Sequence, residues 1–373
     1  MAGSRYKKLE KHDGGDRPTV RPPTNMRGEE TMWRIGITSV FAVCFAGAAL
    51  TADAIPASEP TTIDLTHWVT PDISTAGEDP FGQLVKYGYV LFTDTADQIG
   101  PAVPDAAKRF AGNNLACGNC HLNGGTQPYA MPLIGIWGQF PQYRAREGVV
   151  VTLGDRINGC MMRSLNGHPL PLESREMKAF LAYMRRLSTG VPVGAKLRGA
   201  GTLRINEPER MADSSHGALV YAQVCAACHG SDGLGQHAND GHGYQFPPLG
   251  GPDSFNNGAG MGRLLTIAAY AMHNMPIGTT FNAPVLTDED AYDVAAYIVS
   301  MKRPVMADLD KDFPIRLQKP VDTPYAPYLD GFSLAQHMLG PFNPIRARLQ
   351  ALAMQFGIEK PGGPDNGSDE AVR

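Results

Sequence analysis

Two segments of the chain carry apolar residues at intervals of three and four, the spacing that lines one face of an α-helix. In residues 173–187 the recurring positions are Met177, Phe180, Leu181 and Met184. In residues 288–301 they are Ala291, Val294, Ala295, Ile298 and Val299. We therefore predict an amphipathic helix in each segment. Thr287 and Asp290 have the spacing of an N-terminal capping box, with Asp in place of Glu, at the start of the second.

Each predicted helix closes a unit that contains one copy of a five-residue motif. The first copy is Cys117-Gly118-Asn119-Cys120-His121, and the second is Cys225-Ala226-Ala227-Cys228-His229. Helix-like sequence precedes each copy, at residues 106–116 and 217–224, and Gly-rich sequence follows each. Tyr183 and Tyr297 occupy similar places in the two closing helices. The pattern predicts a mainly α fold built from two similar helical units in tandem.

The composition allows two folded domains and excludes several classes of protein. The chain has 373 residues, of which 43% are apolar and 19% charged, so it can bury a sizeable core. Its net charge of −4 leaves no basic excess with which to neutralise phosphates, so we expect no nucleic-acid partner. Its 6 cysteines are too few for a disulfide-dense scaffold, so their arrangement carries the information.

The N-terminal residues have the features of a secretory signal. An apolar run at residues 35–50 follows Arg27 and Arg34 and precedes Ala52-Asp53-Ala54. A membrane-spanning helix needs about 20 apolar residues, and this run is shorter. We therefore predict export to the periplasm with removal of the leader, and an uncleaved membrane anchor is the alternative. The polar stretch before Met32 is unusual for a signal, which leaves translation from Met26 or Met32 open.

C-x-x-C-H is the motif through which c-type haem is attached covalently. In each motif the two thiols can form thioethers to the two vinyl groups of one haem. These thiols belong to Cys117 and Cys120 in the first motif and to Cys225 and Cys228 in the second. The histidines that follow, His121 and His229, would then bind the iron. We predict two covalently bound haem c groups in two cytochrome c-like domains. The alternative is a zinc site made from both cysteine pairs, which does not require a histidine after each pair.

These features divide the chain into five parts. The predicted parts are a polar extension and secretory signal at 1–54, an N-terminal cytochrome c domain with the active-site haem at 55–190, a linker at 191–215, a C-terminal cytochrome c domain with the electron-transfer haem at 216–305, and a wrapping segment with a disordered tail at 306–373. The linker is rich in Gly and Pro, and the last part is rich in Pro and aromatic residues before a polar end.

Each haem iron needs a sixth ligand, and methionine is usual in electron-carrying cytochromes. In the second unit the best candidate is Met275, which Pro276 follows. Met272 and Met261 are competitors whose flexible side chains also suit a core. His273 is a further candidate and ranks below Met275.

Three possible ligands lie side by side in the first unit: Cys160, Met161 and Met162. In one interpretation a methionine binds the iron and Cys160 is a small buried apolar residue. In the other the Cys160 thiolate binds the iron. The second gives a role to a thiol that would otherwise stay unpaired in an exported protein, since the haems use four cysteines and Cys44 lies in the predicted leader.

Arg146, Arg156 and Arg163 lie close to Cys160 in the sequence. Neighbouring cations lower a thiol pKa and attract anions, so we predict an anion-binding site at Cys160. The alternative role for these arginines is to hold haem propionates, and the two roles can fall to different arginines.

From about residue 60 to 305 the sequence resembles the thiosulfate dehydrogenase family of dihaem c-type cytochromes. The specific likeness lies in Tyr143-Arg144-Ala145-Arg146 and in Arg156-Ile157-Asn158-Gly159-Cys160-Met161-Met162-Arg163-Ser164. The C-x-x-C-H motifs also match, but all c-type cytochromes share them. The resemblance implies an enzyme that joins two thiosulfates into tetrathionate and passes two electrons onward, or that runs the reverse reaction.

The resemblance also implies roles around the first haem. Cys160 would be the thiolate ligand opposite His121, and would leave the iron to carry a thiosulfate-derived sulfur adduct. Arg146, Arg156 and Ser164 would bind the sulfonate oxygens of the substrate.

At the second haem the resemblance implies that Met275 is the ligand opposite His229. Some family members have a lysine before this methionine as an alternative ligand, but the residue here is Asn274. Because Asn has no amine, we expect Met275 to stay bound in both redox states.

The expected partners are thiosulfate, tetrathionate and a soluble or membrane-bound cytochrome or other electron acceptor or donor. Two other functions remain as alternatives. The chain could be a non-catalytic dihaem electron carrier, with Met161 or Met162 on the first iron. It could also be the cytochrome subunit of a sulfur-oxidising complex, which would need a partner protein for activity.

Overall fold

The computed structural model describes residues 60–239 and 241–357. The predicted leader, Cys44 and the predicted disordered tail lie outside this range. Among the described residues no helix is both long and apolar enough to cross a membrane.

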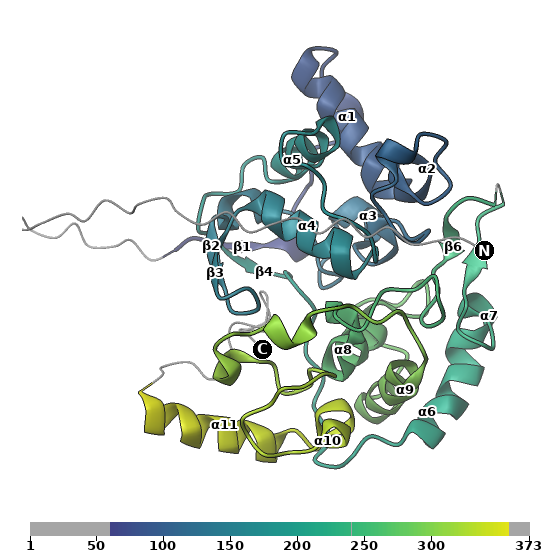
Figure 1. Ribbon diagram of the computed structural model, residues 1–373. Coiled ribbons are helices and arrows are strands. Elements are labelled where there is room, and N and C mark those ends of the chain that lie inside the picture. The colour runs from purple at the N-terminus through teal and green to yellow at the C-terminus, as the bar shows by residue number, and fades with distance from the viewer. Residues whose placement is uncertain (1–59, 240, 358–373) are drawn as a thin grey trace, which may run out of the picture. The chain divides into compact units, whose positions relative to one another are not determined.

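Helices dominate the described part of the chain (Figure 1), as the sequence predicted. The α-helices of the first half are α1 (Pro80–Thr93), α2 (Thr95–Ile99), α3 (Leu122–Gly125), α4 (Leu153–Arg163) and α5 (Arg175–Leu187). Those of the second half are α6 (Ser214–Val220), α7 (Ala226–His229), α8 (Leu264–Asn274), α9 (Asp288–Ser300), α10 (Leu334–Leu339) and α11 (Asn343–Phe356).

The strands form three short pairs that tie loops together. They are β1 (Thr62–Asp64) with β4 (Lys196–Arg198), β2 (Gln142–Arg144) with β3 (Val149–Val151), and β5 (Gln236–His237) with β6 (Tyr244–Phe246). The first pair is parallel and the other two are antiparallel.

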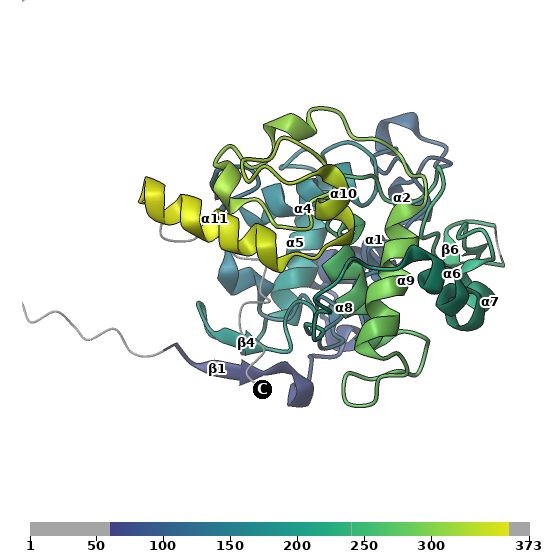
Figure 2. The ribbon, with the colours of Figure 1, turned by 90° about the horizontal axis from the view of Figure 1, so that it is seen from below.

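Two large hydrophobic cores lie one in each half. The first includes Phe92, Ile157 and Phe180. The second gathers residues of α6, α8 and α9, and α11 adds Ile345 and Leu349 to it. Figure 2 shows α11 following α10 at the end of the described chain. The helix α11 is therefore an integral part of the second core.

In each half the first helix crosses the helix that closes the cytochrome unit at a glycine. α1 packs on α5, and α6 packs on α9. A Cβ at Gly88 would overlap the carbonyl of Ala179, and one at Gly217 would overlap the carbonyl of Asp293. The missing side chain lets the two backbones approach closely. The two units that the sequence predicts thus share the same close helix crossing.

Three of the four predicted helical segments are confirmed. α5 begins at Arg175 behind the N-cap Ser174. α9 begins at Asp288 with the predicted capping box of Thr287 and Asp290. Residues 217–224 are helical, in α6 and in a π-helical turn at Tyr221–Cys225.

The prediction of a helix over residues 106–116 was wrong. Only a 3-10 turn forms there, at Ala106–Lys108. The backbone amides of Ala111 and Gly112 donate instead to the carbonyls of Ile99 and Leu165. The buried Asn113 amide donates to the carbonyls of Ser164 and Ser254. Long-range hydrogen bonds replace the helical ones, and no local pattern signals them.

Replacing Gly217 by Ala should destabilise the protein, because the new methyl group must push α6 away from α9. We expect the free energy of unfolding to fall by about 1–3 kcal/mol, the usual range for overpacking. Chemical unfolding of the holoprotein, followed by circular dichroism, measures it. Gly159→Ala is the control, since a Cβ there would meet nothing within 4 Å. Equal stability of the two variants would refute the close crossing.

Candidate functional site

One face of α4 brings the candidate residues of the first unit together. A capping box between Thr152 and Asp155 begins the helix at Leu153. Arg156, Cys160 and Arg163 then follow at intervals of four and three, so they share a face. Arg156 Nη1 donates a hydrogen bond to Cys160 Sγ at 2.8 Å.

This face opens into a pocket that both halves of the chain build. Its walls consist of Arg144, Arg146, Glu147, Arg156, Gly159, Cys160, Arg163, Ser164 and Gly260. The predicted anion-binding residues therefore converge on one place. A binding role for Arg144 was not predicted from the sequence. Its position two residues before Arg146, at the end of β2 and in the same hairpin, was the available signal.

The pocket favours the ionised form of Cys160. Burial raises the pKa of the Cys160 thiol, but Arg156 and His121 more than offset it and bring the pKa down to about 6. The Cys160 charge in turn raises the pKa of Arg156. Burial and the Arg156 charge lower the pKa of Arg144 to about 10, so it stays a cation at neutral pH. The pocket thus holds a thiolate among guanidinium groups.

The two alternative methionine ligands beside Cys160 lie in different surroundings. Met161 is only 1% exposed and belongs to the first hydrophobic core. The backbone carbonyl of Met162 accepts a hydrogen bond from Asn256. Neither side chain lines the arginine pocket.

Both histidines of the C-x-x-C-H motifs are held in the same way. His121 Nδ1 donates to the carbonyl of Met131 at 2.6 Å, and His229 Nδ1 donates to the carbonyl of Pro247 at 2.8 Å. Since a carbonyl oxygen only accepts, each proton sits on Nδ1 and each Nε2 keeps its lone pair for a metal. This fits the histidine ligand of a haem iron at each site.

The cysteines of the two motifs also suit covalent haem. None of the five cysteines in residues 60–239 and 241–357 forms a disulfide. Burial raises the pKa of Cys117 to about 12 and that of Cys120 and Cys225 to about 11. Within the same residues no three His, Cys, Asp or Glu side chains are arranged to hold a metal ion.

Met275 is the C-cap residue directly after α8. Met272 and Met261 contact the second core, and Met261 also contacts the first. His273 is buried, and its Nδ1 donates to the carbonyl of Ala269. Met275 remains the candidate ligand for the second haem.

Asn274, next to Met275, joins α8 to the loop that holds the first haem histidine. Its Oδ1 accepts from Gln127 Nε2 at 2.9 Å, and its Nδ2 donates to the carbonyl of Tyr129 at 3.2 Å. One turn earlier, the Tyr270 hydroxyl donates to the carbonyl of Cys120 at 2.8 Å. The helix α8 is thereby fastened to the first haem motif and to the loop that follows this motif.

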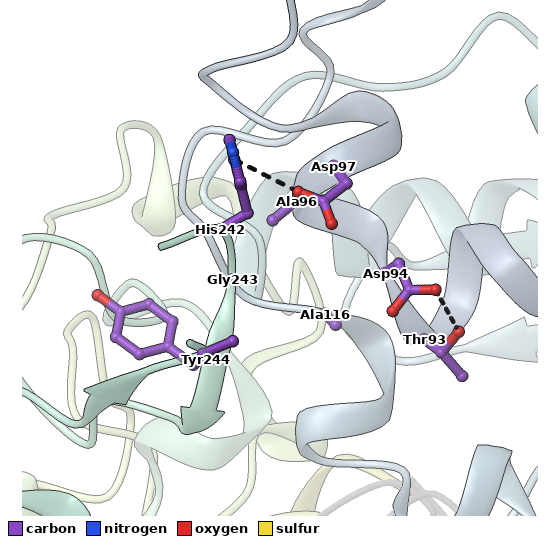
Figure 3. A pocket seen from close by; sticks show the side chains of 9 residues that line it. Thr93, Asp94, Ala96, Asp97, Ala116, His242, Gly243 and Tyr244 are labelled. Carbon is purple, nitrogen blue, oxygen red and sulfur yellow. Dashed lines mark hydrogen bonds and ion pairs between the residues drawn. The ribbon is translucent and has the colours of Figure 1, made fainter. Parts of the chain in front are cut away.

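A second pocket lies on another part of the boundary between the halves (Figure 3). Asp94 and Asp97 line it from α2 and its start, and His242 and Tyr244 face them. His242 Nδ1 lies 3.5 Å from Asp97 Oδ1. Its carboxylates would repel the anions that the arginine pocket suits.

Comparisons with known families and proteins agree with this geometry. The family model "SoxA/TsdA, cytochrome c domain" matches residues 107–193, and the model "Cytochrome c" matches residues 214–302. These matches confirm the predicted fold of two tandem cytochrome c domains and the two covalently bound haem c groups.

Several curated relatives are named thiosulfate dehydrogenase. The one from Allochromatium vinosum is 42% identical over 258 residues, which are 68% of this chain and 89% of the relative. The one from Stutzerimonas stutzeri is 41% identical over 60% of this chain and 69% of the relative. A solved structure, the thiosulfate dehydrogenase TsdBA of Marichromatium purpuratum, superposes with a TM-score of 0.59 at 32% identity. It covers 74% of this chain, whereas this chain spans 55% of it.

Asn274→Ala should weaken the joint between α8 and the first haem loop. The change leaves the Gln127 amide and the Tyr129 carbonyl without this partner, and such a loss costs about 1–3 kcal/mol of unfolding free energy. Asn343→Ala, which removes an exposed hydrogen bond to Glu209, is the control and should change stability by less than about 0.5 kcal/mol. Denaturant unfolding compares them, and an Asn274 variant as stable as the control would contradict the joint.

Proposed function

This chain belongs to the thiosulfate dehydrogenase family, and on that premise we propose that it is a haem-based oxidoreductase that joins two thiosulfates into tetrathionate. The observation that carries the proposal is the contact between Cys160 and Arg156 in a pocket lined by four arginines. In this arrangement a nucleophilic sulfur lies among positive charges that attract anions.

The arginines can offset the repulsion between the two negatively charged substrates. Thiosulfate is a dianion, so two of them in one site repel each other strongly. Guanidinium groups bind oxyanions through two parallel hydrogen bonds and offset that repulsion. Arg144, Arg146, Arg156 and Arg163 supply this charge, and the Ser164 hydroxyl adds a neutral donor.

The Cys160 thiolate is suited to form the first sulfur–sulfur bond. Its sulfur bonds to the terminal sulfur of one thiosulfate, and the resulting Cys160–S–S–SO3⁻ adduct has lost two electrons. The terminal sulfur of a second thiosulfate then attacks the thiosulfate-derived sulfur that is bonded to Cys160 Sγ, and Sγ is the leaving group. Tetrathionate leaves and the thiolate is restored, as in thiol–disulfide exchange. No proton is taken up or released.

Haems held by the two C-x-x-C-H motifs would supply the electron acceptors, one electron each, and a soluble or membrane-bound cytochrome or another acceptor would then take the electrons. The step conserves charge in both directions, so the same residues serve tetrathionate reduction. We propose tetrathionate as the product of the forward reaction and as the substrate of the reverse.

We further propose that the protein works in the periplasm. The support is the basic start, the short apolar run and the Ala-x-Ala site at residues 27–54. Fractionation of cells that express the full chain tests this: the haem-stained protein should appear with periplasmic markers, and its recovery with cytoplasmic markers would refute the proposal.

Cys160→Ala should lower turnover of thiosulfate by roughly three orders of magnitude or more, since the adduct can no longer form. Both haems should stay attached, because the motif cysteines are untouched. Tetrathionate formation with an artificial one-electron acceptor measures activity, and haem staining with mass measurement counts the haems.

Met162→Leu is the matched control, since Met162 lies next but one to Cys160 and outside the pocket. We expect it to keep full turnover and an unchanged first-haem spectrum. Retained activity in the Cys160 variant would refute the role of Cys160. Absence of turnover in the unaltered holoprotein, in both directions, would favour an electron carrier or a partner-dependent subunit.

A further inference from the structure

The chain after the second cytochrome domain returns to the arginine pocket of the first. The light green stretch of Figure 1 passes beside the β2–β3 hairpin, where the Phe313 amide donates to the carbonyl of Arg146 at 2.7 Å. The Phe313 ring lies 5.3 Å from the Arg146 guanidinium carbon. Tyr143 of the hairpin donates its hydroxyl proton to Gln318 at 2.8 Å. The segment therefore packs on the wall of the pocket.

Asp312 of this segment contacts two of the pocket arginines. Its Oδ1 accepts from Arg163 Nη2 at 2.7 Å, and its Oδ2 lies 3.5 Å from Arg146 Nη1. The Tyr325 hydroxyl donates to the same Oδ2 at 2.7 Å. Asp312 is 8% exposed and does not line the pocket. Its carboxylate thus reaches the substrate site only through the arginines.

The two arginines need such a partner because their positive charges lie close together. Arg146 Nη1 and Arg163 Nη1 both donate to the single carbonyl of Gly258, at 2.6 and 3.1 Å. Burial lowers the pKa of Arg146, and the neighbouring Arg163 lowers it further, whereas Asp312 opposes this. Without the carboxylate, repulsion would drive the two guanidinium groups apart.

We propose that Asp312 is a positioning residue, which holds Arg146 and Arg163 in place for anion binding, with Tyr325 orienting its carboxylate. The C-terminal segment is then a part of the substrate site. The inference rests on the proposed function, which makes the pocket the thiosulfate site. The direction of the change in anion affinity distinguishes this role from a simple charge effect. If Asp312 acted only through its negative charge, its removal would tighten anion binding. If Asp312 positions the arginines, its removal weakens anion binding.

The test compares Asp312→Asn with Asp310→Asn in the holoprotein. Asp310 is an exposed residue of the 3-10 turn Leu309–Lys311, which directly precedes Asp312. Steady-state kinetics with thiosulfate and an artificial acceptor give kcat and KM. Calorimetric titration with sulfate, the unreactive oxygen analogue of thiosulfate, gives anion affinity without turnover. Electron paramagnetic resonance of the first haem reports whether its ligands have moved.

In Asp312→Asn we expect KM to rise and sulfate affinity to fall by about tenfold or more, with kcat within about threefold and the first-haem signal unchanged. Asp310→Asn should match the unaltered protein. Unchanged or tighter sulfate binding in Asp312→Asn would overturn the proposal. So would a joint loss of kcat, haem signal and thermal stability, which marks a general structural role.

The two proposals fail separately. If the unaltered protein does not turn over thiosulfate but sulfate binding still depends on Asp312, the proposed function fails and the positioning role stands. If Asp312→Asn does not fold, Tyr325→Phe replaces it, because this change keeps the carboxylate and removes the hydroxyl that donates to Asp312 Oδ2 and accepts from Arg146 Nη1 at 3.4 Å. It should weaken sulfate binding in the same direction, and unaltered binding would overturn the proposal.

Discussion

Repulsion among guanidinium groups is the constraint around which this protein is arranged. Four arginines line one pocket, and each must be held against the charge of the others. Arg156 donates to Cys160, and Arg144 lies near Glu147. The remaining two converge on the Gly258 carbonyl and the Asp312 carboxylate. A site that attracts dianions is thus stabilised from outside its own domain.

This constraint explains why neither cytochrome domain builds the site alone. The amide of Asn256 donates to the carbonyl of Arg163, and its side chain donates to the carbonyl of Met162. The loop that carries Gly258 therefore follows the end of α4 closely. The second domain contributes backbone acceptors and the C-terminal segment a carboxylate, which together fix the arginines before a substrate arrives. Preorganised charge of this kind needs no rearrangement when the anion binds.

Sequence reasoning succeeded where the information was local. The three-to-four spacing predicted α5 and α9. The helix α4, which places Arg156 and Cys160 on one face, was not predicted, although their closeness in sequence did point to a common site. It failed where long-range hydrogen bonds decide. Residues 106–116 have helix-like composition, yet Asn113 is bonded to residues 164 and 254, and the chain follows those contacts. Asp312 was invisible for the same reason, since nothing near it in sequence points to Arg163.

The two haem motifs show how one local device serves two different sites. In each the histidine Nδ1 is bonded to a carbonyl from the loop that follows, so the imidazoles are presented alike. The difference lies in their surroundings, since the Cys160 thiolate lies near His121 among the arginines, whereas Met275 opposite His229 stays a prediction from the sequence.

Asn274 links the second cytochrome domain to the first haem motif. It is hydrogen-bonded to Gln127 and Tyr129, which shortly precede Met131, and the Met131 carbonyl accepts from His121. A lysine at this position would lose the amide's paired donor and acceptor and would have to place its charge among buried groups. Asn274 thus acts as a joint between the two domains. The prediction that Met275 stays bound in both redox states rests on the separate fact that Asn274 has no amine to offer the iron.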